Sequence, residues 1–266
     1  MALGQSQEQL LDVRLRLEYA HAKLQHIDTQ RAAFLAREPF VVACRIEPVS
    51  EEKVWYIDQR EAAPMQLRLM IGEFIHHVRA SLDNLVWPLA CSNASGTPHS
   101  QTQFVVRNHP NEFVIDRSGR LRDLSPGVQD ATEKFQPYAI EVPAGEDHAV
   151  WMLNRFWNDD KHRAPLVAAQ PQLQALDFRY LGPLTIPPNT PVTPRLYPMG
   201  DKGDFSVVGR MPRDHPGYGV PCEFQLGFDL AFDDSSAGKR RPLMPTLNQL
   251  LGVAIDVVRD VCTAAD

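Results

Sequence analysis

Apolar residues recur at every third or fourth position in four long stretches of the chain, a spacing that predicts amphipathic helices. These stretches are residues 6–36, 63–94, 144–162 and 244–263. Pro39 follows the first stretch and Pro165 follows the third, in positions where proline ends a helix. Pro88 lies inside the second stretch, where we expect a kink or the end of the regular helix.

Shorter segments alternate apolar and polar residues, a pattern typical of β-strands. Residues 40–47 and 53–59 flank a polar turn and predict a hairpin. The clearest later strand is 223–232, in which every second residue is phenylalanine or leucine. We also expect short strands at 103–106 and 112–116, and an exposed linker that contains the basic run 239–241.

Helices from both ends of the chain, with strands between them, predict an α+β fold. The expected architecture is a bundle of about four long helices, the first, second, third and C-terminal, packed with a mostly antiparallel sheet from about 40–59 and 174–233. A chain of 266 residues can bury one large core, so we expect a single compact domain over residues 1–266.

The composition is that of an ordinary soluble protein, with 44% hydrophobic and 23% charged residues. The formal net charge of −6 excludes a strongly basic footprint over the whole protein. Four scattered cysteines without metal-ligand spacing predict reduced core thiols, at positions 44, 91, 222 and 262. Because no signal segment or membrane-length apolar run is present, we expect a cytoplasmic protein with no membrane partner.

The second predicted helix contains an unusual run of polar residues, 72-GEFIHHVRASLDNLVW-87. Helical geometry places four of them on the side opposite the apolar face, namely Glu73, His76, Arg79 and Asp83. Leu69, Ala80 and Trp87 share that side, and a helix that is apolar nearly all round is typically buried. These polar side chains are therefore either a functional site or a solvated or ion-paired structural stripe.

The third predicted helix ends in 158-NDDKHR-163, and its acids and bases suggest a partner for this stripe. Lys161 and His162 suit the negative end of a helix. Asp160 falls on the apolar face, where a carboxylate needs a partner, and we expect that partner to be Arg79. This pairing would bring the polar residues of both helices together in one composite site.

Three acid–histidine pairs have a spacing of three residues, which puts both side chains on one helix face. The pairs are Glu18–His21, Glu73–His76 and Asp159–His162. Metal-binding helical bundles use Glu-x-x-His pairs of this kind. A divalent metal held by Glu73, His76, Asp159 and His162 is thus an alternative to a protein without a cofactor.

The stretch IHHVRASLDNLVWPLA, followed downstream by NDDKHR, resembles a broad group of uncharacterised bacterial proteins with H-N-L-R-x-A-L-D-H and D-K-H-R motifs. The resemblance covers the first three long helices and implies no activity. Asn84 stands where the group tends to have histidine.

The chain also resembles HEPN domains, helical bundles that include metal-independent ribonucleases of toxin and antiviral systems. Their motif is arginine followed after four to six residues by histidine, which Arg155 and His162 match. The resemblance implies that arginine stabilises phosphate charge and that histidine transfers protons. The candidate catalytic residues are then Arg155, His162, Arg79 and His76, and the candidate binding residues are Glu73, Asp83, Asp160 and Lys161.

Three functions remain open from the sequence. The first is a HEPN-like protein of a bacterial defence or toxin system that binds or cleaves RNA. The second is a metal-binding helical bundle with oxidoreductase-type chemistry. The third is a non-catalytic binding or assembly protein. The candidate partners are RNA and a second copy of the chain.

Overall fold

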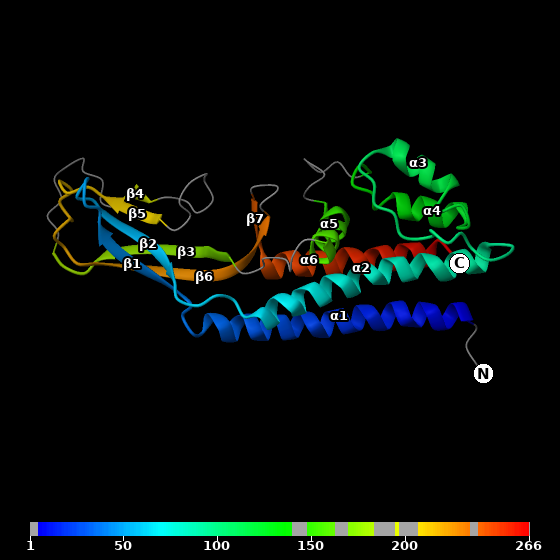
Figure 1. The fold of residues 1–266 in the computed structure, drawn as a ribbon, viewed down its shortest axis with the longest axis horizontal. Coiled ribbons are helices and arrows are strands. Elements are labelled where there is room, and N and C mark those ends of the chain that lie inside the picture. Colours follow the sequence, from blue (N-terminus) through cyan, green and yellow to red (C-terminus); the bar gives the residue numbers. More distant parts are fainter. Residues whose placement is uncertain are drawn as a thin grey trace. The chain divides into compact units, whose positions relative to one another are not determined.

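Six α-helices are present in the part of the chain that the structure, a computed structural model, describes (Figure 1). That part comprises residues 5–139, 148–162, 170–183, 195–196, 207–234 and 239–265. The helices are α1 (Gln5–Leu35), α2 (Met65–Asn93), α3 (Pro110–Ser118), α4 (Pro126–Glu133), α5 (Ala149–His162) and α6 (Leu243–Thr263). Together with antiparallel sheets they confirm the predicted α+β class. The packing of the four long helices as one bundle stays a prediction.

The chain divides into two compact units. The helical unit contains Met1–Thr29, Met65–Leu166 and Met244–Asp266, and the sheet unit contains Gln30–Pro64 and Val167–Leu243. These units follow the predicted helical and sheet parts, and the prediction of one compact domain stays a prediction. Within the described ranges, no helix is long and apolar enough to cross a membrane.

In the helical unit, α1 and α2 run antiparallel and side by side (Figure 1), as the pairs Lys23–Glu73 and Asp12–Asn84 require. Their facing sides are apolar and buried, and α6 contributes a third apolar side. The core of these helices includes Val13, Leu17, Leu24, Ile71, Phe74, Val78, Leu82, Leu247, Leu250 and Val257. α2 continues through Pro88 to Asn93, so the helix does not end at this proline.

The segment 102–107 is extended but belongs to no strand, so the predicted strand at 103–106 is wrong. Its backbone N–H and carbonyl groups form hydrogen bonds with side chains instead. The Gln136 side-chain oxygen accepts from the Arg107 N–H at 2.8 Å, and its amide nitrogen donates to the Val105 carbonyl at 3.0 Å. The predicted strand at 112–116 is also wrong, because Pro110 starts helix α3 there.

The sheet unit contains two small antiparallel sheets. The first has the order β1 (Phe40–Ile46), β2 (Lys53–Gln59), β5 (Val207–Met211) and β4 (Arg195–Leu196). The second has the order β3 (Gln170–Tyr180), β6 (Cys222–Asp234) and β7 (Lys239–Pro242). The predicted hairpin of β1 and β2 is confirmed.

Aromatic rings join β2 to β3 and β6. The Trp55 ring lies 5.2 Å from that of Phe224 and 6.4 Å from that of Phe178, measured between ring centroids. Phe224 of β6 therefore packs against β2, as the alternation of the strand predicts. The basic run 239–241 is not a linker, because it forms most of β7 and pairs with the end of β6.

The four cysteines are free thiols, and Cys44 is exposed while the other three are partly exposed. Their predicted placement in the core is therefore wrong. The spacing of the cysteines argues against a metal-binding motif, but it does not predict how deeply each cysteine is buried, because cysteine is small enough to pack at many positions.

Candidate functional site

The polar side of α2 separates into two groups that differ in their surroundings. Glu73 and His76 line an open pocket between α2 and α5, and both residues are exposed. Arg79 and Asp83 lie one to two turns further along, where Arg79 is only 4% exposed. The two interpretations of the stripe that the sequence left open thus apply to different parts of the same helix.

The pocket, called the α2–α5 pocket below, has a volume of about 450 Å³. Its lining combines acidic, basic, imidazole and indole groups with one apolar side chain: Leu69, Gly72, Glu73, His76, His77, Trp157, Asp160 and Lys161. Pockets that bind small molecules typically measure about 300–1,000 Å³. Four residues predicted from the sequence, Glu73, His76, Asp160 and Lys161, therefore come together here.

Trp157 organises one wall of this pocket. Its indole N–H donates to Nδ1 of His76 over 3.4 Å, a long and weak hydrogen bond. Because Nδ1 accepts, a neutral His76 carries its proton on Nε2 and can donate from there. The Lys161 ammonium lies 4.7 Å from the centroid of the Trp157 ring, and this cation–π contact limits where the lysine head can move.

Asp160 approaches α2 at Gly72, where a Cβ atom would lie only 2.8 Å from the Asp160 Oδ1 oxygen. Glycine at this position allows the carboxylate to pack against the helix backbone. Among the residues described, the Asp160 carboxylate makes no hydrogen bond or ion pair. A partly buried carboxylate without a partner is costly to maintain, so it indicates a group that accepts a ligand.

The expected ion pair between Arg79 and Asp160 is wrong. Asp160 packs against Gly72, seven residues before Arg79, which corresponds to about 10 Å along the axis of α2. Arg79 instead pairs with Asp83 at 2.6 Å. The composite site that this pair would have joined is therefore split.

Arg79 and Asp83 act together as a clamp on the extended segment 102–107. The Arg79 Nη2 group donates to the Phe104 carbonyl at 2.8 Å, and the Asp83 Oδ1 oxygen accepts from the Phe104 N–H at 3.1 Å. Arg79 Nε also lies 3.4 Å from the side-chain oxygen of Asn154. The pair thus occupies both backbone groups of Phe104, as a neighbouring strand would, and this accounts for its polar groups without a ligand.

His77 also lines the pocket and is partly exposed. Burial lowers the pKa of its imidazole, and the nearby His76 and Arg16 lower it further. Its Nδ1 atom is buried without a hydrogen-bond partner, while its ring meets that of Tyr19 edge-on at 4.6 Å. The lowered pKa therefore favours the neutral form of His77 beside the pocket.

Glu73 stands at the rim of the pocket and accepts from the Lys23 ammonium at 2.7 Å. The Glu73 side chain is 54% exposed, so this pair contributes little to stability. The hydrogen bond to Glu73 raises the pKa of Lys23, which keeps the rim lysine charged.

The residues of the HEPN-like motif lie on a different side of α5 from the pocket. Arg155 Nε lies 3.7 Å from Asp159 Oδ2, and the Arg155 guanidinium lies 5.2 Å from the centroid of the Trp151 ring. The side chain of His162 is outside the described part of the structure, so the pairing of Arg155 with His162 stays a prediction. Helical spacing puts residues 155 and 162 on one side of the helix and residues 157, 160 and 161 on another.

The described residues contain no group of three or more histidine, cysteine, aspartate or glutamate side chains that could hold a metal ion. Glu73 and His76 face the pocket, whereas Asp159 pairs with Arg155. The fourth predicted ligand, His162, has no described side chain. The metal site therefore stays a prediction.

Sequence reasoning missed three residues that shape the pocket: Gly72, His77 and Trp157. Gly72 in the middle of a predicted helix was the available signal, because glycine there weakens a helix unless close packing requires it. Trp157 had no distinguishing signal, since a tryptophan on the apolar side of a helix is usually core. His77 differed from His76 only by its helix angle.

No known protein family, curated protein or solved structure matches the chain.

Proposed function

We propose that the protein is a non-catalytic binding protein whose helical unit holds a small zwitterionic molecule in the α2–α5 pocket. The observation that carries this proposal is the unpaired Asp160 carboxylate, which packs on Gly72 and lines the pocket. Arg79, a candidate catalytic residue of α2, and Asp83, a candidate binding residue, are already engaged with each other and with the Phe104 backbone.

The charges around the pocket favour a ligand that carries both signs. Asp160 is an acceptor for an ammonium group, and Lys161 and the Nε2–H of His76 are donors for a carboxylate. The rim adds one acid and one base, Glu73 and Lys23, which neutralise each other. Leu69 offers an apolar contact for a small side chain of the ligand.

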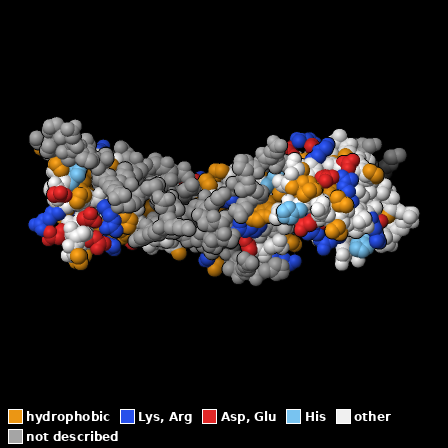
Figure 2. All heavy atoms as spheres, turned by 90° about the horizontal axis from the view of Figure 1, so that it is seen from above, with side chains coloured by type: hydrophobic (Ala, Val, Ile, Leu, Met, Phe, Trp, Pro, Cys, Tyr) orange, Lys and Arg blue, Asp and Glu red, His pale blue; other side chains and the backbone are white. Residues whose placement is uncertain are grey.

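The same balance argues against RNA as the ligand. Binding to a phosphate backbone requires an excess of lysine and arginine along the contact surface. The pocket lining has two carboxylates, Glu73 and Asp160, against one permanently charged cation, Lys161, and on the face that Figure 2 shows, basic side chains are interspersed with acidic ones. RNA cleavage through Arg155 and His162 is the competing prediction.

A thermal-shift titration with free amino acids tests the proposal, since a ligand that binds the folded state raises its melting temperature. We expect at least one amino acid to stabilise the wild type. Asp160→Asn should abolish the shift, because it removes the acceptor charge. Asp159→Asn is the matched control: it changes the adjacent acid, which faces Arg155 rather than the pocket, and should keep the shift.

Two results would reject this function. The first is that no amino acid raises the melting temperature of the wild type or of Asp159→Asn, or that an amino acid raises the melting temperature of Asp160→Asn as much as that of the wild type. The other is cleavage of RNA by the wild type in EDTA that is lost on His162→Ala, because that result establishes the competing ribonuclease.

A further inference from the structure

The sheet unit contains two glutamates with a positive φ angle, Glu38 at 53° and Glu51 at 56°. Residues other than glycine rarely adopt this left-handed conformation. Glu51 has contacts that explain its position: its carboxylate pairs with Arg213, and its carbonyl accepts from the Tyr218 hydroxyl at 2.8 Å. The Glu38 carboxylate has no ion pair or hydrogen bond to any residue in the described ranges.

Glu38 follows the end of α1, where the chain turns toward β1. Its N–H donates to the Leu35 carbonyl at 3.0 Å, which closes the last turn of the helix. Glycine or asparagine is the usual residue in the left-handed conformation at such a helix end. A glutamate there is therefore unexplained by the turn itself, and backbone strain of this kind clusters at ligand sites.

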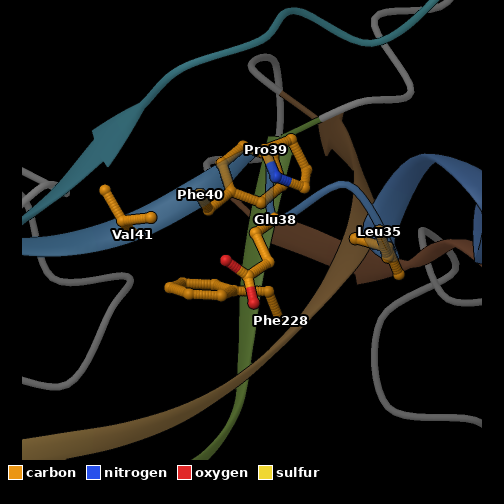
Figure 3. A pocket seen from close by; sticks show the side chains of 6 residues that line it. All are labelled: Leu35, Glu38, Pro39, Phe40, Val41 and Phe228. Carbon is orange, nitrogen blue, oxygen red and sulfur yellow. The ribbon is translucent and has the colours of Figure 1, made fainter.

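The Glu38 side chain lines a pocket of about 240 Å³ together with Leu35, Pro39, Phe40, Val41 and Phe228. In Figure 3 this side chain extends away from Pro39 toward Phe228. The rings of Phe40 and Phe228 have centroids 5.5 Å apart and are inclined by 50°. Two inclined rings and one carboxylate thus border the same small space.

We propose that this pocket, called the Glu38 pocket below, binds the quaternary ammonium head of a small organic cation. Aromatic faces attract such a cation through their electron-rich surfaces, and the ammonium carries no N–H group that would need a hydrogen-bond acceptor. The Glu38 carboxylate supplies the counter-charge that it lacks in the protein alone. Pro39 and Leu35 add apolar surface for the methyl groups.

The inference is independent of the α2–α5 pocket, because all its residues belong to the sheet unit. It is tested by calorimetric titration of the full chain with choline and with 3,3-dimethylbutan-1-ol, a neutral molecule of the same shape. We expect choline to bind and the neutral analogue to bind about tenfold more weakly, since the charge contact with the exposed Glu38 and the attraction of the cation to the rings together contribute about 1.4 kcal/mol.

Matched variants identify the site. Glu38→Gln keeps the size of the side chain and removes its charge, so we expect choline binding to weaken about two- to fivefold, the effect of an exposed charge contact. Phe228→Leu removes an aromatic face and should also weaken it. Glu51→Gln changes the other glutamate of positive φ. That glutamate pairs with Arg213 and does not line the Glu38 pocket, so the variant should leave binding unchanged.

The proposal is overturned if the folded wild type does not bind choline, or if choline and its neutral analogue bind equally well. It is also overturned if Glu38→Gln binds as the wild type does. Circular dichroism of each variant establishes that a loss of binding is not a loss of folding.

Discussion

At the scale of single residues, the contact between Gly72 and Asp160 fixes the shape of the α2–α5 pocket. The missing Cβ of Gly72 leaves the space that the Asp160 carboxylate fills. This is a close approach that any larger residue would prevent. It is also the reason that Asp160 meets α2 at this level of the helix and not at Arg79, whose hydrogen-bond partner on α5 is Asn154.

Gly72→Ala should therefore separate folding from binding. Alanine is favoured over glycine inside a helix by about 1 kcal/mol, which offsets the displacement of the Asp160 side chain. We expect a free energy of unfolding in urea within about 1 kcal/mol of the wild type, together with loss of the amino-acid thermal shift. A variant that folds and keeps the full shift would show that Asp160 does not need its position on Gly72.

Two histidines with lowered pKa values should make the stability of the protein depend on pH. Burial lowers the pKa of both His77 and His148 below the ordinary value of 6.5. Both imidazoles are then neutral in the folded state, and the unfolded state binds more protons as the pH falls. The stability is complete above pH 6.5 and decreases as the pH falls through the two lowered pKa values.

Urea denaturation at pH 7.5 and pH 5.5 measures this dependence. We expect a lower free energy of unfolding at pH 5.5, and a smaller difference between the two pH values in His77→Gln. Equal stability of the wild type at both pH values would mean that neither imidazole is desolvated.

The residue scale also shows what a helical projection can and cannot predict. It placed Arg79 and Asp160 on sides that face each other. It carries no information on height along the axis, and a mismatch of two turns was enough to separate them. Glu73, His76 and Asp160 do line one pocket, as predicted, because their positions along the helix axes agree.

At the scale of elements, the segment 102–107 is held by side chains that substitute for a neighbouring strand. Arg79 and Asp83 occupy the backbone groups of Phe104, and Gln136 occupies those of Val105 and Arg107. The apolar residues 104–106 predicted a strand, and no strand forms there. The pattern could not indicate that the partners are side chains of α2 and of the turn after α4, since they are remote in sequence.

Gln136→Leu should destabilise the helical unit through this segment. Leucine fills the fully buried position but leaves the Arg107 N–H and the Val105 carbonyl without partners, which costs roughly 2–4 kcal/mol. Urea denaturation measures the loss, and hydrogen exchange should show a faster-exchanging Arg107 amide. Gln129→Leu, on the preceding helix α4, is the control, because its amide donates to carbonyls of the turn before α4 and should leave the Arg107 amide protected.

At the scale of the whole molecule, the strongly periodic segments were predicted well. α1, α2 and α6 begin and end within about two residues of their predicted bounds, because long amphipathic helices carry their own signal. β7 was missed because a short strand of basic residues carries no apolar pattern and depends on its pairing with β6. The division into two units depends on contacts between distant segments, which no local pattern records.

The two halves of the polar stripe, Glu73 and His76 at the pocket and Arg79 and Asp83 in the clamp, should differ in how much they contribute to the stability of the fold. Residues that serve binding are held in positions that do not favour folding, whereas residues of a structural network contribute to it. Asp160 is unpaired within the described residues, and Asp83 supports both Arg79 and the Phe104 backbone. The same substitution at these two sites should therefore have opposite consequences.

The most direct test is the free energy of unfolding in urea for Asp83→Asn and Asp160→Asn at pH 7.5. We predict that Asp83→Asn loses roughly 2–3 kcal/mol, because the buried Arg79 guanidinium keeps its charge without a counter-ion. Asp160→Asn should equal or exceed the wild type, because a partly buried unpaired charge is removed. A loss for Asp160→Asn as large as that for Asp83→Asn would contradict the division of the stripe into a clamp and a binding pocket.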